Sequence, residues 1–163
     1  MAGELEQEVA RLVAAQRWGA LASLEADGGG APLASMIAYA GGPALSHLLF
    51  FVSGLAAHTR NLLADPRASL AVGQPDRGEG DPQTLPRVSL SGRAVPIERD
   101  DPGFAAAWER YVSRFPDAEP RRALADFVLF RFAFDDVRYV GGFARAARLS
   151  AEELQGAARE LGL

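Results

Sequence analysis

The spacing of its strand-like segments limits what this chain can fold into more than any other feature. Two apolar segments, residues 18–25 and 32–40, flank a D-G-G-G sequence at residues 27–30. Glycine tolerates the positive φ angles of a tight reversal, so the two segments are predicted to form a β-hairpin. Close pairs of this kind favour antiparallel strands in a small barrel over a doubly wound parallel sheet, which needs long crossovers.

Five further segments are predicted to be strands: residues 48–52, 68–74, 88–97, 127–134 and 136–140. The first, LLFFV, is wholly apolar, which is typical of a buried strand. The third alternates apolar residues with polar or small ones, which indicates a strand with one buried face. The expected fold is therefore mainly β within the α+β class, with an antiparallel, barrel-like sheet and flanking helices.

Helical patterns accompany the strands at both ends and in the middle of the chain. Apolar residues recur at helical spacing in residues 4–16 and 100–115. Ser150 and Glu153 form a capping box, which predicts a final helix that ends near Leu163.

One more helix is predicted after the apolar run LLFFV. Ser53 is expected to open it, and Pro66 to stop it, because proline cannot continue the helical hydrogen-bond ladder. The two tryptophans, Trp18 and Trp108, are both expected in the core because of the large area that tryptophan buries.

Composition excludes several classes of function. At 163 residues the chain has the length of one domain, residues 1–163. Its net charge of −4 gives no attraction to phosphate backbones, so nucleic acid is not an expected partner. It has no apolar stretch long enough to cross a bilayer, and the expected location is the cytoplasm. All 17 basic residues are arginine and cysteine is absent, so arginine is the only permanent cation and thiolate chemistry is excluded.

Motifs for metal or nucleophilic catalysis are missing from the sequence. Its two histidines, His47 and His58, do not have the spacing of a metal site, and no metal is expected. No G-x-S-x-G elbow, P-loop or G-x-G-x-x-G fingerprint occurs. An enzyme of this composition is therefore expected to take its chemistry from an organic cofactor.

The segment SGLAAHTRNLLADP, residues 53–66, carries the densest group of polar side chains. Ser53, His58, Thr59 and Arg60 lie where a strand is predicted to enter a helix, and such a position suits a phosphate group. The alternative is that Ser53 only caps the helix and Arg60 is only a solvated surface residue. Composition alone weights the two interpretations equally.

Four segments in order resemble the pyridoxamine 5′-phosphate oxidase-like, FMN-binding split-barrel family, and within it the haem-utilisation (HugZ-type) branch most. The segments are ASMIAY (34–39), LLFFVSGLAAHTRNLLADPRASLAV (48–72), PRVSLSGRA (86–94) and VRYVGGFARA (137–146). The resemblance implies a split β-barrel homodimer with two FMN molecules at the subunit interface.

The same resemblance implies a set of cofactor-binding residues: Ser35, Met36, Ser53, His58, Thr59, Arg60, Arg87, Phe143 and Arg145. Ser35 and Met36 would lie along the flavin, and the segment beginning at Ser53 would hold its phosphate and ribityl chain. Phe143 and Arg145 would approach the flavin edge of the other subunit. No catalytic residue is implied.

The function expected from this resemblance is FMN-dependent oxidation or reduction of a small aromatic or heterocyclic substrate. A haem- or flavin-binding protein related to haem utilisation, without turnover, is the first alternative. A dimeric binding scaffold that has lost FMN is the second.

Overall fold

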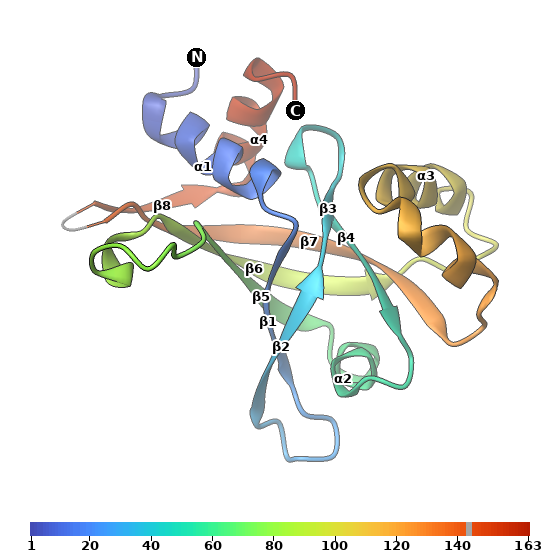
Figure 1. The fold of residues 1–163 in the computed structure, drawn as a ribbon. Helices are drawn as coiled ribbons and strands as arrows, with labels where there is room; N and C mark the ends of the chain where they lie inside the picture. Colours follow the sequence, from blue (N-terminus) through green and yellow to red (C-terminus); the bar gives the residue numbers. More distant parts are fainter. Residues whose placement is uncertain (143–144) are drawn as a thin grey trace.

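The computed structural model describes residues 1–142 and 145–163, and its centre is one curled antiparallel sheet (Figure 1). In chain order the described strands are β1 (Trp18–Leu24), β2 (Pro32–Ala38), β3 (Ala40–Gly41), β4 (Leu48–Ser53), β5 (Arg67–Gly73), β6 (Arg87–Pro96), β7 (Phe127–Val140) and β8 (Ala146–Ser150). Their order in the sheet is β2-β1-β5-β6-β7-β4-β3, and β8 also pairs with β7. Only Tyr39 separates β2 from β3 in the chain, so the two ends of this order lie next to each other and the sheet curls into a half-barrel. The predicted fold class is confirmed.

Four α-helices flank this sheet in the described residues: α1 (Glu4–Ala15), α2 (Ala57–Ala64), α3 (Phe104–Arg114) and α4 (Ala151–Glu160). Short 3-10 turns form η1 (Pro43–Leu45), η2 (Pro82–Thr84) and η3 (Pro116–Ala123). The capping box predicted for α4 is confirmed, because the Ser150 hydroxyl accepts from the Glu153 N–H and the Glu153 carboxylate accepts from the Ser150 N–H. None of the described helices is long and apolar enough to span a bilayer.

The barrel interior forms the larger of two hydrophobic cores. Phe50, Phe130 and Phe132 are fully buried in it, and α1 and α4, side by side in Figure 1, cover one side with Val9 and Leu154. Burying side chains of this size contributes about 1.5–3 kcal/mol each. The inner face of the sheet is therefore the main source of stability.

A second core between β4 and α3 explains why LLFFV is wholly apolar. Phe50 faces the barrel interior, and its neighbours Leu49 and Phe51 belong to the α3 core. The Phe51 and Trp108 rings meet edge to face with centroids 4.8 Å apart. Because both faces of β4 are covered, a polar residue has no solvated position there.

The helix predicted to open at Ser53 begins four residues later. Ser53 is the last residue of β4 and pairs with Phe127 in β7. The next residue, Gly54, donates its N–H to the Asp126 carbonyl, so the chain stays extended beyond the strand. The N-cap of α2 is Ala56, and α2 ends at Ala64, as the proline predicted.

Two predicted strands, residues 127–134 and 136–140, are one strand of 14 residues. Its pairing with β6 changes register between Ser91 and Gly92, which leaves Asp135 as the extra residue of a β-bulge. The sequence prediction left residue 135 outside both strands, but a bulge at this residue lets the strand continue. β8 was not predicted, because its short A-A-R-L-S sequence carries little strand signal.

Trp18 is not a core residue, whereas Trp108 is. Trp18 is 61% exposed at the start of β1, and Trp108 is 3% exposed. In β1 the residues that alternate with Trp18, such as Gly19 and Leu21, point into the barrel, so Trp18 points outward.

Glu8 of α1 links this helix to the far end of β7. Its carboxylate accepts from the Tyr139 hydroxyl and, at 2.8 Å, from an Arg145 Nη atom. The Tyr139 hydroxyl, more than Arg145, holds the pKa of Glu8 below its ordinary value. Burial and the Glu8 carboxylate together raise the pKa of Tyr139 to about 12.

We expect Gly92→Ala to destabilise the protein by about 1–3 kcal/mol, the cost of overpacking. A Cβ at Gly92 would overlap the Ala133 carbonyl oxygen and the Phe134 Cα across the bulge. Gly73→Ala is the matched control in the neighbouring strand, because its Cβ would meet its nearest atom at 3.7 Å. Chemical denaturation of both variants checks this, and equal effects would contradict it.

We expect Glu8→Gln to lower the unfolding free energy at pH 7 by about 1 kcal/mol, the value of a charge-assisted contact at a partly exposed site. The folded-state pKa of Glu8 is lowered from 4.5, so the stabilisation is fully present above pH 4.5. It is lost as the pH falls through the lowered pKa. Denaturation midpoints measured from pH 7 downward should therefore converge, and a gap that is independent of pH would refute this interpretation.

Candidate functional site

Three of the predicted phosphate-binding residues come together in the turn between β4 and α2. The Ser53 hydroxyl donates to Asp126 Oδ2 over 3.1 Å and accepts from the Leu55 N–H over 3.2 Å. The Thr59 hydroxyl is fully buried and donates to the Ser53 carbonyl over 2.6 Å. The exposed Arg60 guanidinium donates to the Leu55 carbonyl over 2.7 Å. These contacts make a compact turn, and the Arg60 side chain of this turn is exposed to solvent.

His58 lies half-buried on α2 beside this turn. Burial lowers the pKa of His58 below its ordinary value of 6.5, so the imidazole is neutral at pH 7. The turn therefore presents one guanidinium, a neutral ring and, next to Ser53, the Asp126 carboxylate.

Arg87 and Arg145 lie at the opposite end of the sheet. Arg87 begins β6 and pairs with Val140, the last residue of β7, and its Nη1 donates to the Gln83 carbonyl over 2.7 Å. Arg145 precedes β8 and is held by Glu8. Phe143, also predicted to bind the cofactor, lies outside the described residues.

Within one chain the two groups are far apart. Ser53 pairs with the first residue of β7, and Arg87 pairs with the last. Thirteen residue steps of an extended strand span about 40 Å. The predicted cofactor residues therefore do not form one site in a single copy of the chain.

Ser35 and Met36, on β2, point to opposite faces of the sheet. Ser35 is half-buried opposite the core residue Leu21, whereas Met36 is 51% exposed on the outer face. Here the outer face means the side of the sheet turned away from the barrel core.

Met36 begins a row of directly paired residues that crosses the outer face from strand to strand. The row, which we call the outer-face row, consists of Met36, Ala20, Ala71, Ser89, Arg138 and Arg148. Directly opposite residues in antiparallel strands point to the same side. Five inter-strand spacings give the row a length of about 24 Å. It is apolar at β2, small in the middle and cationic at β7 and β8.

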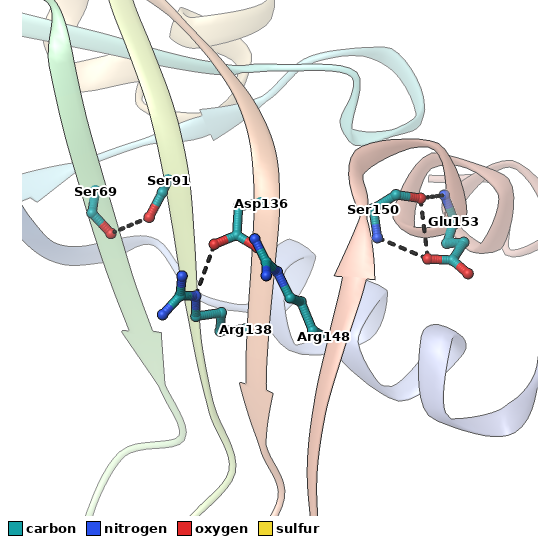
Figure 2. A network of polar contacts seen from close by, with 7 residues as sticks. All are labelled: Ser69, Ser91, Asp136, Arg138, Arg148, Ser150 and Glu153. Carbon is teal, nitrogen blue, oxygen red and sulfur yellow. Dashed lines mark hydrogen bonds and ion pairs between the residues drawn. The ribbon is translucent and has the colours of Figure 1, made fainter.

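One carboxylate orients the two arginines at the cationic end (Figure 2). The Nε of Arg138 donates to one Asp136 oxygen over 2.8 Å, and the Nε of Arg148 donates to the other over 2.5 Å. Both guanidinium groups hold the pKa of Asp136 below its ordinary value. The cluster keeps one net positive charge, and each arginine retains Nη donors for a further anion.

The outer face is hollowed beside this row. A cavity of about 490 Å³ is lined by residues of β1, β2, β5, β6 and β7. On its floor the hydroxyls of Ser69 and Ser91 are 3.1 Å apart and hydrogen-bonded (Figure 2). Small side chains and a hollow let a flat molecule lie close to the sheet, while the arginines at the end of the row can bind its acidic groups.

Sequence reasoning missed Trp18, Arg138 and Arg148 as surface residues of this face. Arg138 alternates with buried Val137 and Tyr139, which was a usable signal for an outward-pointing cation. The position of Arg148 opposite Arg138 depends on β8, which the sequence did not predict.

A family model, a sequence relative and solved structures are similar to this chain. The pyridoxamine 5′-phosphate oxidase family model matches residues 5–141. The chloroplastic non-canonical heme oxygenase HOZ of Arabidopsis thaliana is 36% identical over 110 residues, which cover 65% of this chain and 32% of that protein. A heme binding protein from Mycobacterium smegmatis has a similar structure, with a TM-score of 0.82 and 31% identity, over 96% of this chain and 62% of that one. The chain thus spans about a third of the length of the Arabidopsis protein and under two thirds of the length of the Mycobacterium protein.

HutZ from Vibrio cholerae, described as a heme storage protein, shares the fold with a TM-score of 0.69 and 23% identity, over 83% of this chain and 92% of HutZ. The family match extends from α1 to the residue after β7, so it includes the Ser53–Arg60 turn and Arg87, whereas Arg145 and β8 lie beyond it. On this evidence the chain belongs to the pyridoxamine 5′-phosphate oxidase family.

Proposed function

We propose that two copies of this chain bind haem between their outer faces, in a role in haem utilisation. The observation that carries the proposal is the outer-face row, which is apolar at one end and cationic at the other. Haem has the matching chemistry, because it is a flat apolar ring with two carboxylates along one edge. The heme-related names of the Arabidopsis and Mycobacterium relatives support this choice of ligand.

The residues present fit such a ligand at three points. Exposed Met36 and Trp18 offer apolar surface at one end of the face. Ala71, in the middle, is small enough to leave the ring close to the backbone. Arg138 and Arg148 would bind the propionates by charge-assisted hydrogen bonds, which are about twice as strong as neutral ones. Asp136 fixes both guanidinium groups before the ligand arrives.

A second copy completes the arrangement. A two-fold axis would place the apolar end of one outer face against the cationic end of the other. It would also bring Arg87 and Arg145 of one copy toward the Ser53–Arg60 turn of the other, although the two groups lie about 40 Å apart along β7 of a single chain. Enclosure from both sides excludes water from the ring, as in most cofactor sites. Bound haem would supply iron redox chemistry, while the chain holds and orients it.

We expect Arg138→Ala and Arg148→Ala each to weaken hemin binding about tenfold, because each removes a charge-assisted contact worth about 1.5 kcal/mol or more. Arg11→Ala is the matched control, since Arg11 is an exposed arginine on α1. The measurement is a hemin titration followed in the Soret band. A wild-type chain that is monomeric in sedimentation and still binds hemin would contradict the two-copy arrangement.

FMN is the second candidate ligand, with oxidoreduction of a small aromatic or heterocyclic substrate as its function. The Ser53–Arg60 turn favours it, because an exposed guanidinium lies next to the N-terminus of α2, which has no side-chain cap. Membership of the pyridoxamine 5′-phosphate oxidase family agrees with a flavin.

If FMN is the ligand, Arg60→Ala should weaken its binding about tenfold through loss of a phosphate contact. Quenching of flavin fluorescence measures this, and hemin is titrated in parallel. Loss of FMN binding in Arg60→Ala with intact hemin binding would assign the two ligands to different ends of β7. Absence of FMN binding to the wild-type chain would remove the flavin candidate and leave the haem proposal.

A further inference from the structure

We propose that the chain has a second small-molecule site, which binds an organic monocarboxylate with an apolar body. The site is a cavity of about 680 Å³ between the end of α1, the β3–η1 segment and α3. In Figure 1 the β3–η1 segment lies between α1 and α3. No residue of the outer-face row and no residue predicted to bind the cofactor lines this cavity, so it is separate from the outer-face site.

The cavity has the size and lining of a ligand site. Small-molecule pockets have volumes of about 300–1,000 Å³ and are mainly apolar, with a few polar groups that fix orientation. Ala14, Pro43, Ala106 and Leu163 supply apolar surface here, and Val13, Tyr39 and Leu45 are buried behind it. The Tyr39 hydroxyl is already used, because it donates to the Val13 carbonyl over 2.6 Å. An apolar ligand body therefore meets no unsatisfied polar group from Tyr39.

Two arginines on one face of α3 supply the positive charge. Arg110 and Arg114 are four residues apart, so they are neighbours on the helix surface. Arg110 donates from Nε to the Gly41 carbonyl over 2.5 Å. Arg114 donates from Nη2 to the carbonyls of Ala14 and Gln16, each over 2.9 Å. These bonds hold both guanidinium groups at the cavity wall.

Neutral carbonyls fix these arginines but do not cancel their charge. Across residues 1–142 and 145–163, neither Arg110 nor Arg114 forms an ion pair. A guanidinium has five N–H donors, so each keeps donors for a ligand. Glu109 is the one carboxylate side chain on the cavity wall, which leaves a side-chain charge of +1. A ligand carboxylate has the planar geometry that matches the guanidinium fork.

The test is calorimetric titration of the full chain with decanoate, with decanamide as the neutral comparison. We expect saturable decanoate binding that is at least about tenfold tighter than decanamide binding, because one charge-assisted contact is worth that much. Ala106→Trp should weaken binding, because the indole would occupy part of the cavity. Ala105→Trp is the matched control, because Ala105 is an exposed residue of α3 that does not line the cavity.

Removing the charge of either of two adjacent exposed residues should change decanoate affinity in opposite directions. Glu109→Gln should tighten decanoate binding several-fold, and Arg110→Gln should weaken it about tenfold. Hemin binding should be unchanged in all four variants, so failure of this proposal is distinguishable from failure of the haem proposal. If decanoate up to about 1 mM shows no saturable binding, the proposed site is overturned. A Kd of that size corresponds to a binding free energy of about −4 kcal/mol. Equal binding by Ala106→Trp and Ala105→Trp would overturn it as well.

Discussion

The backbone pairing of β7 is the interaction on which the rest of the molecule depends. One edge of β7 pairs with β6 along nearly its whole length, and the other edge pairs first with β4 and then with β8. The bulge opposite Gly92 increases the local twist and bends so long a strand without ending its ladder. The bend closes the barrel over Phe130 and Phe132 and turns Asp136 and Arg138 outward.

The outer face of the same sheet is covered in one part and bare in another. α3 packs on β4 through Phe51 and Trp108, but no described helix covers the small residues of the outer-face row on β1, β5 and β6. Met36 is 51% exposed, so a ligand or a second copy that covers it can gain roughly 1 kcal/mol of burial. Exposed apolar surface next to fixed cations is typical of an interaction site rather than of a solvated surface.

Sequence patterns predicted the elements whose signals are local. The hairpin turn has positive φ at Gly29 and Gly30, and the Ser150 cap begins α4, because both depend on residues close in the chain. Sequence patterns did not predict features that depend on pairing with another strand. Asp135 looked like a break, but β6 holds the chain together across it. The placement of Arg138 beside Arg148 required the register of β8, which local propensity does not contain. The residues predicted to bind the cofactor remain a hypothesis, because in one copy the Ser53–Arg60 turn and Arg87 lie at opposite ends of β7.

The distribution of charge favours haem over FMN as the proposed ligand. At the Ser53 turn the Asp126 carboxylate accepts from the Ser53 hydroxyl, and the Thr59 hydroxyl is buried in the turn. A dianionic phosphate there would face a like charge, which costs between about 1 and 4 kcal/mol at close range, depending on solvent exposure. At the cationic end of the outer-face row, Asp136 is already shared by two arginines, so an incoming carboxylate meets a net positive charge. Asp126 would therefore repel a phosphate at one end of β7. At the other end, the charge of Asp136 is already compensated by Arg138 and Arg148.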